Sequence, residues 1–375
     1  MANKKSRKVD IIGELSRGFT QRTVPEGYMD DPVARRAYGD YFGEVGFEKG
    51  AALSREIRNR RPPGFSGRGR LSMVDLGTGT GEFVRGLSEG LLPDIPDGID
   101  LLCVDRSLSA LQEFSGQWAR PEGISLRLVP ALLPEASDLL RIAGPVDVLS
   151  MANLLAENED RLSGFLELLK GFLERLSPGG LMILVEPADR RSSRSLLGLG
   201  DRLLDLFPDL RILAPCPNDR RGPCPSLASP DGWCHEDRPA AFSRSLTQTA
   251  SSLGHIKDSL KMTYLILSRG EKGVGESEEC ALRLVSPLHK EKGMSWGVFC
   301  GGTTLFRLRL KNRNRNEVTR AFVHLRRGET IRNPGLFSSE DEATEGAFSD
   351  WPSEIPLTGL FRPDGTPFDI SGKED

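Results

Sequence analysis

The sequence has no long apolar stretch. A membrane-spanning helix needs about 18 or more consecutive apolar residues, whereas the longest candidates here, such as Leu181 to Val185, have the length of a strand. The basic N-terminal residues 1–15 are not followed by the apolar segment that a secretory signal carries. We therefore predict that the protein does not enter a membrane, and we expect a reducing, cytoplasmic location.

An excess of charge of one sign is also absent over the whole chain. The 375 residues carry 50 Lys and Arg against 53 Asp and Glu, and 38% of them are hydrophobic, which is typical of a soluble globular protein. A chain of this length can bury the core of one large domain with additions, or of two domains. We expect one domain with additions and a monomeric protein. The sequence contains no internal repeat.

Charge is nonetheless uneven along the chain. Between Phe306 and Arg327 a single acid, Glu317, stands among eight basic residues: Arg307, Arg309, Lys311, Arg313, Arg315, Arg320, Arg326 and Arg327. Such a segment indicates either a phosphate-binding surface or an edge strand that its charges protect from pairing. Residues 336–375, by contrast, are acidic and rich in Pro, Gly and Ser, so we expect a disordered or loosely attached tail.

Strands and helices alternate through the central part of the chain. A helical lead-in, residues 1–70, ends at a segment rich in Pro, Gly and Arg, and apolar strands then alternate with helices over residues 71–270. This alternation predicts an α/β domain with a parallel, doubly wound sheet. Residues 214–239 form a cysteine-rich insertion in that domain, and residues 280–335 form a small β-rich, basic appendage.

The first chemical motif is a glycine loop, "VDLGTGTGEF", residues 74–83. Gly77, Gly79 and Gly81 follow an apolar strand and let the backbone approach a ligand closely. The spacing G-x-G-x-G differs from the dinucleotide fingerprint G-x-G-x-x-G, and Glu82 stands where helix amides would bind a pyrophosphate. A cationic sulfonium cofactor is compatible with that acid. A nicotinamide dinucleotide and a plain turn without ligand are the alternatives.

A carboxylate follows the second strand, in "LLCVD", where Asp105 can accept both hydroxyls of a ribose. This pairing resembles the S-adenosylmethionine site of class I methyltransferases, and "LSPGGLMILVEP" resembles the helix end, turn and fifth strand of the same Rossmann-like fold. The resemblance implies this fold. It also implies that the methionine end of the cofactor is held by Asp75, Gly77, Thr78, Gly79 and Gly81, and the ribose by Asp105.

The acceptor side carries weaker signals. In class I enzymes the end of the fourth strand faces the transferred methyl group, and here that stretch contains Asn153 and Glu157. No N-P-P-[YF] element and no cysteine occur there. Because methyl transfer can be promoted by positioning alone, Asn153 and Glu157 are candidate catalytic residues. Asn153 fits the role of a helix cap equally well.

Three cysteines, Cys216, Cys224 and Cys234, lie within 19 residues of a loop rich in Pro, Gly and charge. The loop lacks the short ligand spacing of structural zinc sites and contains no C-x-x-C redox motif. Longer, irregular spacing suits an iron-sulfur cluster. The fourth ligand is either Cys300, which two glycines follow, or His235, which would complete a zinc site. Cys103 is expected in the core, and Cys280 has no comparable flanks.

Together these motifs resemble the mitochondrial small-ribosomal-subunit methyltransferase-like family and its bacterial relatives, which act in ribosome assembly. The likeness spans roughly residues 30–315 and is carried by "DLGTGTG", "PCPNDRRGPCP", "DGWCH", "YLILS" and "SPLHKEKGMSWGVFCGG". It implies a [4Fe-4S] cluster held by Cys216, Cys224, Cys234 and Cys300, bound S-adenosylmethionine, and small-subunit ribosomal RNA as partner.

Two departures from the family pattern affect these expectations. Asn218 and Asp219 stand where family members usually have a histidine, and "EPADRRSSR" replaces a Pro-Gly-Thr-Pro-like turn. The second change places Arg190, Arg191 and Arg194 beside the expected cofactor face, where they would suit an RNA phosphate.

The sequence thus predicts a protein that binds S-adenosylmethionine and an iron-sulfur cluster, and that methylates or binds small-subunit ribosomal RNA in ribosome assembly and translation. One alternative is a non-catalytic assembly factor with structural cofactors. The other is a small-molecule methyltransferase with a structural zinc ion.

Overall fold

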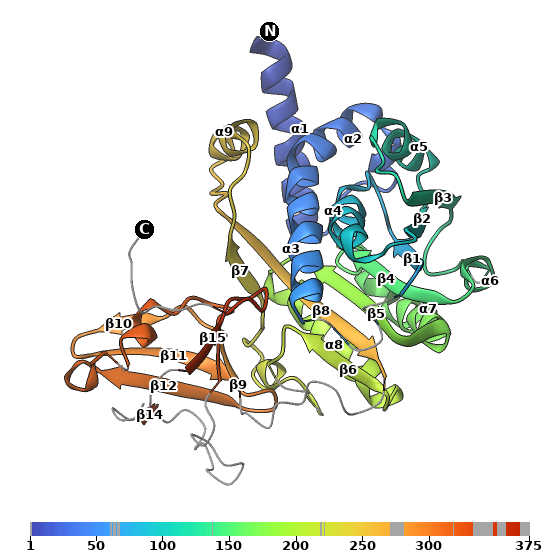
Figure 1. Ribbon diagram of the computed structural model, residues 1–375. Coiled ribbons are helices and arrows are strands. Elements are labelled where there is room, and N and C mark those ends of the chain that lie inside the picture. Colours follow the sequence, from blue (N-terminus) through green and yellow to red (C-terminus); the bar gives the residue numbers. More distant parts are fainter. Residues whose placement is uncertain are drawn as a thin grey trace.

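The structure of the chain is a computed structural model. It describes residues 2–60, 68–136, 138–217, 222–270, 281–317, 319–332, 348–350 and 358–367, and the single residues 62, 65 and 220. In these ranges the strands form two sheets, which lie side by side (Figure 1). Among the same residues, no helix combines the length and the apolar character needed to cross a membrane.

The N-terminal residues form the helices α1 (Ala2–Gln21), α2 (Pro32–Tyr38) and α3 (Glu44–Arg60), with the short turns η1 (Tyr28–Asp30) and η2 (Gly39–Gly43). Asp31 caps α2 by accepting a hydrogen bond from the Val33 amide. Helix α3 packs closely against α4 (Glu82–Leu91) because Gly50 lacks a Cβ, which would overlap the carbonyl of Phe83. Close packing of this kind fixes the lead-in helices on the first sheet.

The first sheet contains eight strands among the described residues, in the order β3-β2-β1-β4-β5-β8-β6, with β7 paired to β8. Strands β1 to β5 are parallel, and β8 runs antiparallel to both β5 and β6. The prediction of a doubly wound parallel sheet is confirmed. The strands are β1 (Leu71–Leu76), β2 (Ile99–Asp105), β3 (Ile124–Pro130), β4 (Val146–Ala152), β5 (Leu176–Glu186), β6 (Leu210–Ala214), β7 (Glu236–Pro239) and β8 (Ser259–Arg269).

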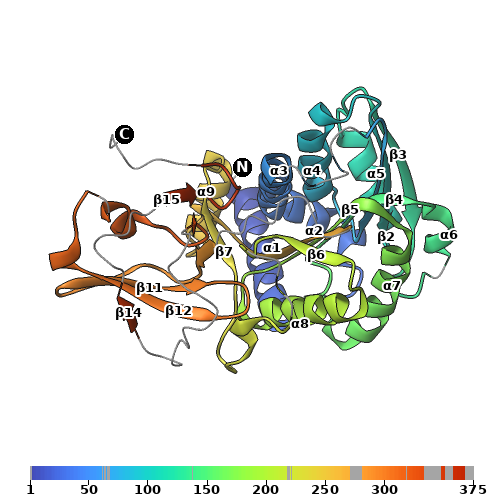
Figure 2. The same ribbon diagram turned by 60° about the horizontal axis from the view of Figure 1, so that its bottom comes forward.

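Helices cover both faces of this sheet (Figures 1 and 2). Alternate residues of β1 enter different cores: Met73 packs with residues of α3, α4 and α5, whereas Val74 packs with residues of α7 and α8. Continuous apolar strands are what a sheet buried on both faces requires. The covering helices are α4 (Glu82–Leu91), α5 (Leu108–Gln117), α6 (Leu139–Ala143), α7 (Leu162–Arg175) and α8 (Arg190–Leu206); α9 (Arg244–Ser252) packs near η2.

The second sheet is formed by the C-terminal part of the chain, in the order β14-β12-β11-β9-β13-β15, with β10 paired to β11. Its core contains Phe299 and Phe322. The strands are β9 (Ala281–Leu284), β10 (His289–Glu291), β11 (Met294–Cys300), β12 (Leu305–Lys311), β13 (Thr330–Arg332), β14 (Phe348–Asp350) and β15 (Thr358–Phe361), and the short helical turns are η6 (Asn312–Asn314) and η7 (Arg320–His324).

Two expectations about the C-terminal part change with this sheet. The expected loose tail contributes β14 and β15, which pair with β12 and β13; the other tail residues lie outside the described ones. Strand β12 is no edge strand, and two of its cations, Arg309 and Lys311, form ion pairs with Asp350. The acidic tail therefore neutralises part of the basic segment that the sequence assigned to phosphate binding.

The two sheets meet at a seam of buried charged and polar side chains, Glu56, Glu236, Arg238, Tyr264 and Arg283. Arg238 donates to Glu56 Oε2 at 2.7 Å, and the Tyr264 hydroxyl donates to the same oxygen at 2.9 Å. Arg283 of the second sheet forms an ion pair with Glu236 of β7. All five side chains are buried. Their charges are paired, as buried ions must be to remain charged, and the Glu236–Arg283 pair joins the two sheets.

Candidate functional site

The glycine loop connects the end of β1 to the start of α4. Gly77, Gly79 and Gly81 have positive φ angles of 74°, 56° and 82°, a region that glycine enters without steric cost. At Gly81 a Cβ would also overlap the ring of Phe114. Glu82 begins α4 and accepts a hydrogen bond from the Thr80 hydroxyl at 2.5 Å. The loop thus requires glycine at these positions and is acidic at its helix end.

Asp75 lies beneath this loop and is buried, with 3% of its surface exposed. Its carboxylate accepts a hydrogen bond from the Ser150 hydroxyl of β4 at 2.5 Å, and its carbonyl accepts one from the Thr78 hydroxyl at 3.2 Å. Burial, opposed by the Ser150 hydrogen bond, raises the pKa of Asp75 to about 7. A positive ligand on the loop would favour the ionised form.

Asp105 ends β2 and is tied to the glycine loop. Its Oδ2 accepts the Gly79 amide at 2.8 Å, and its Oδ1 accepts the Ser107 amide at 2.8 Å. Burial raises the pKa of Asp105, although both backbone donors oppose the rise. Each carboxylate oxygen keeps a further lone pair, so Asp105 can still accept two ribose hydroxyls.

The structure places both acceptor-side candidates at the end of β4. Asn153 has a left-handed φ of 57°, and its amide donates to the Val185 carbonyl at 2.8 Å. It caps no helix, because the next helical turns begin at Glu159 and Leu162. Glu157 accepts a hydrogen bond from the Tyr28 hydroxyl at 3.4 Å.

The environment of Glu157 changes its acidity. Its side chain is exposed to solvent, but the protein atoms around it desolvate it in part. This desolvation, followed by the charge of Asp105, raises the pKa of Glu157 to about 7. A carboxylate with a pKa near the working pH suits general base catalysis.

Sequence reasoning missed a fully buried carboxylate, Glu186, at the end of β5. Its two oxygens accept the amides of Leu155 at 2.8 Å and Ala156 at 3.0 Å, so it fixes the loop that carries Glu157. Burial raises the pKa of Glu186 to about 8, and burial lowers the pKa of the nearby Lys49 to about 8. The available signal was an acid that closes an otherwise apolar strand.

An aromatic cluster from the N-terminal helices, Phe19, Tyr28, Tyr38 and Phe42, was also missed. Neighbouring ring centroids lie 5.2 Å to 6.0 Å apart. Burial, followed by the charge of Glu157, raises the pKa of Tyr38 and of Tyr28. This electrostatic coupling means that the tyrosines lie close to the acidic end of the sheet.

These geometries decide the fold. Asp75, the glycine loop and Asp105 lie at the carboxyl ends of adjacent parallel strands, in a sheet whose strands β1 to β5 follow the order 3-2-1-4-5 before an antiparallel strand. This is the class I S-adenosylmethionine-dependent methyltransferase fold. The prediction of the fold is confirmed.

Comparisons with known proteins gave matches only among solved structures; no family model and no curated protein matches the chain. A plantazolicin methyltransferase solved with SAH is 15% identical and matches over 72% of this chain and 99% of its own, with a TM-score of 0.37. An rRNA methylase from Streptococcus thermophilus is 12% identical and matches over 58% of this chain and 95% of its own, with a TM-score of 0.31. Precorrin-6y C5,15-methyltransferase from Geobacter metallireducens is 13% identical and matches over 58% of this chain and 86% of its own, with a TM-score of 0.34.

The second group of predicted site residues, the cysteine cluster, comprises Cys216, Cys224, Cys234 and Cys300. The structure brings them close enough to influence one another's ionisation. Burial, followed by the charges of Cys216 and Cys234, raises the pKa of Cys300, and burial, followed by Cys234, raises that of Cys224 to about 12. Cys216 and Cys234 pack against the core cluster that contains Cys224, and Cys300, 84 positions after Cys216, ends β11 of the second sheet within electrostatic reach of them.

Donor groups point toward these thiols. The Gly302 amide donates to Cys300 Sγ at 3.4 Å, and Arg283 Nη1 donates to Cys234 Sγ at 3.8 Å. Arg220 is buried, and its Nε and Nη2 have no hydrogen-bond partner among the described residues, while Cys216 and Cys224 influence its pKa. The thiols therefore lie beside two buried arginines, each of which also pairs with an acid, Arg220 with Asp201 and Arg283 with Glu236.

The remaining candidate ligands are Cys103, Cys280 and His235. Cys103 is buried in the core of the first sheet, as expected, and Cys280 lies outside the described residues. His235 lies with Nδ1 3.4 Å from Arg327 and stacks on Trp233. Within the part of the chain that the structure describes, no group of three His, Cys, Asp or Glu side chains has the arrangement that holds a single metal ion.

The three arginines expected to face an RNA phosphate have other partners. Arg194 donates to the carbonyls of Ser229 and Gly232, both at 2.7 Å. Arg190 forms an ion pair with Asp231, and Arg191 with Glu159. The expectation for Arg194 is wrong, because its guanidinium binds the cysteine loop to α8.

Proposed function

We propose that the protein binds S-adenosylmethionine at the glycine loop. The observation that carries this proposal is the hydrogen bond from the Gly79 amide to Asp105, which holds this carboxylate beside the loop. Asp75 is buried beneath the same loop. Bound S-adenosylmethionine would supply a methyl group activated on a positively charged sulfur. Asp105 would hold the ribose, and the acidic surroundings of the loop favour a cation over a pyrophosphate.

We propose further that the acceptor is small-subunit ribosomal RNA, methylated during ribosome assembly. The aromatic cluster supports a flat acceptor, because bases stack well on aromatic side chains. Glu157 would accept the proton that the acceptor atom loses, and Asn153 would orient the acceptor. The resemblance of the cysteine and glycine motifs to the ribosome-assembly family supports the choice of RNA.

The test is methylation of isolated small subunits with tritiated S-adenosylmethionine. Wild type is expected to label ribosomal RNA, and Asp105→Ala is expected to lose the label and the cofactor affinity together. The matched control is Asp100→Ala, because Asp100 is an exposed residue of the same strand. Unlabelled RNA with wild type, together with normal subunit assembly in Asp105→Ala, would favour a non-catalytic assembly factor.

We also propose that the cysteine cluster holds a [4Fe-4S] cluster. Three features support the fit: the fold brings Cys300 near the cysteine loop, amide and guanidinium groups donate to Cys300 and Cys234, and two buried nitrogens of Arg220 have no hydrogen-bond acceptor among the described residues. Donors of this kind stabilise thiolate ligands. The cluster would join the first sheet to the second, as its ligands come from both.

Anaerobic purification tests the cluster. We expect a brown protein with about four irons and four sulfides per chain, and loss of both in Cys216→Ser. Cys103→Ala is the matched control, since Cys103 lies in the core of the first sheet. One zinc per chain without iron or sulfide would contradict the proposal and support the structural zinc site instead.

A further inference from the structure

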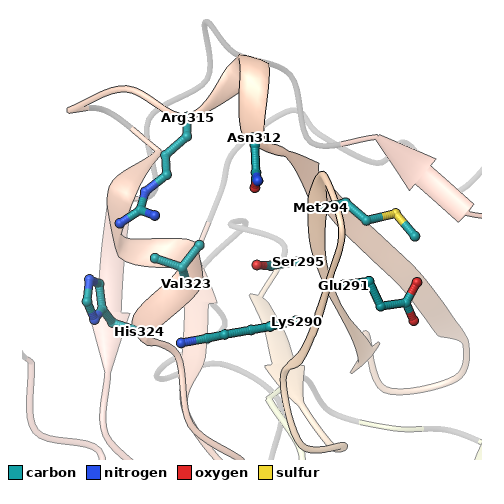
Figure 3. A pocket seen from close by; sticks show the side chains of 8 residues that line it. All are labelled: Lys290, Glu291, Met294, Ser295, Asn312, Arg315, Val323 and His324. Carbon is teal, nitrogen blue, oxygen red and sulfur yellow. The ribbon is translucent and has the colours of Figure 1, made fainter.

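A concave site lies on the second sheet (Figure 3). None of its lining residues belongs to the glycine loop. It is a hollow of about 260 Å³, somewhat below the volume of pockets that hold drug-sized ligands. It can therefore take one small polar molecule or one nucleotide of a strand. The residues that line it are Lys290, Glu291, Met294, Ser295, Asn312, Arg315, Val323 and His324.

The walls of this hollow are fixed by the fold. Ser295 of β11 pairs with Lys290 of β10 and is buried, while the Asn312 amide donates to the Gly293 carbonyl at 2.8 Å. The segment that carries Arg315 is held by Thr319, which is fully buried and whose hydroxyl donates to the Asn314 carbonyl at 3.0 Å. The hollow is thus built from three separate segments held in place by hydrogen bonds.

Three cationic or ionisable side chains converge on the hollow: Lys290, Arg315 and His324. None of the three side chains forms an ion pair or hydrogen bond with the described residues. The acid among the lining residues, Glu291, accepts a hydrogen bond from the Trp296 indole at 2.8 Å, and its carboxylate points away from the Lys290 ammonium (Figure 3). Unpaired cations that gather at one point attract an anion.

We propose that this hollow binds the phosphate group of a nucleotide. The Arg315 guanidinium offers a planar fork that matches phosphate oxygens, and Lys290 adds a compact charge. The Ser295 hydroxyl and the Asn312 side-chain amide add polar groups to the lining. Three positive or ionisable groups match a phosphate better than a single carboxylate. The nucleotide is either a free mononucleotide or the 5′ end of an RNA strand.

The hollow works independently of methyl transfer, because it lies on the other sheet and shares no residue with the glycine loop. The proposal also narrows the role of the basic segment between Phe306 and Arg327. Arg309 and Lys311 are neutralised by Asp350, so of the eight basic residues Arg315 is the one that lines this hollow.

Binding is tested with the full chain and two probes, adenosine monophosphate and an eight-nucleotide RNA that carries either a 5′-phosphate or a 5′-hydroxyl. The double variant Lys290→Ala/Arg315→Ala is expected to weaken binding of the phosphorylated probe about 100-fold, about tenfold for each charged contact. The matched control is Lys292→Ala/Arg313→Ala, which removes the same charges from exposed neighbours outside the hollow. Its expected effect is below about threefold.

Each result decides the proposal. If only adenosine monophosphate binds, and Lys290→Ala/Arg315→Ala weakens that binding, the ligand is a free nucleotide. A preference for the RNA with a 5′-phosphate over the RNA with a 5′-hydroxyl supports a strand end. Equal losses of affinity in Lys290→Ala/Arg315→Ala and in Lys292→Ala/Arg313→Ala would show general attraction to RNA and overturn the proposal. So would equal affinity for the 5′-phosphate and 5′-hydroxyl RNA combined with no binding of adenosine monophosphate. The Asp105→Ala variant is expected to bind both probes like wild type, which separates this test from that of the proposed function.

Discussion

The carboxyl end of the first sheet and the cysteine cluster differ in the charged groups that surround them. At the carboxyl end, desolvation raises the pKa of Asp75, Glu157 and Glu186. A cationic ligand would stabilise the ionised form of such carboxylates. At the cysteine cluster, Arg220 and Arg283 lie beside the thiols. Both of these arginines already have acid partners, Asp201 and Glu236 respectively.

The seam beside the cysteine cluster differs from the carboxyl end in how its charges are balanced. There each acid has an arginine partner, as Glu236 has Arg283 and Glu56 has Arg238. Arginine neighbours lower the pKa of Glu56 despite the opposing effect of its burial. The carboxyl end is poised for a ligand that brings positive charge, while the seam is already neutralised. The following variants test this contrast.

Removing one charge from the seam is expected to have the largest effect. Glu236→Gln leaves Arg283 and Arg238 in the interior without that counter-ion, and loss of one partner of a buried ion pair costs about 3–5 kcal/mol. Urea unfolding at pH 7 measures the loss. Asp237→Asn is the matched control on the same strand: its pair with Lys261 is exposed and 3.9 Å long, so we expect a change below about 1 kcal/mol. Equal losses would contradict a neutralised seam.

The raised pKa of Asp75 at the carboxyl end is expected to make the free energy of unfolding depend on pH. The pKa of Asp75 is raised in the folded chain from 3.8 to about 7. The associated stability is present below pH 4 and is lost as the pH rises toward 7, by at most about 1.4 kcal/mol per pH unit. Asp75→Asn should flatten this fall. The fall is measured by unfolding between pH 5 and pH 8.

S-adenosylmethionine and S-adenosylhomocysteine sharpen the same test, because only the first carries a positive sulfur. We expect the first to reduce the pH dependence of wild type more than the second does. The control for the variant is Asp100→Asn, since the pKa of exposed Asp100 is lowered rather than raised by Arg70. An unchanged slope in Asp75→Asn would show that the folded chain does not hold a protonated Asp75.

Asp105→Asn is expected to weaken cofactor binding by about 1.5–3 kcal/mol, because one charged hydrogen-bond acceptor is replaced by an amide. This change is smaller than the loss of stability expected for Glu236→Gln. Isothermal titration with S-adenosylhomocysteine measures the change. The Gly79 amide would lose its carboxylate acceptor as well. Affinity equal to that of wild type would place the ribose elsewhere.

Tyr28→Phe should have the smallest effect. It removes the 3.4 Å hydrogen bond that lowers the pKa of Glu157, so the pH profile of methyl transfer should move upward by less than about one pH unit. Tyr38→Phe is the comparison, because Tyr38 makes no hydrogen bond to Glu157 within the described residues. If Tyr38→Phe shifts the pH profile more than Tyr28→Phe does, Tyr38 and not Tyr28 sets the pKa of Glu157.

Local sequence patterns predicted the parts of these sites that follow from strand order. The glycine loop and Asp105 follow adjacent parallel strands, so their meeting at one edge could be foreseen. Cys300 could be paired with the cysteine loop because of its glycines. Glu186 could have been found as the acid that ends an apolar strand. Lys49 and Tyr28 could not be foreseen, since only the packing of the N-terminal helices brings them to the sheet. Strand β14 has three residues and no pattern of its own; its pairing depends on Asp350 and the cations of β12.

The seam also makes the packing of the first sheet depend on a distant part of the chain. Glu56, Glu236, Arg238 and Arg283 come from positions spread over more than 200 residues. A chain shortened to residue 270 would keep the pairs of Arg238 with Glu56 and Glu236 but would lack Arg283. Loss of the C-terminal part would therefore uncover this surface of the first sheet and leave Glu236 with one arginine partner instead of two.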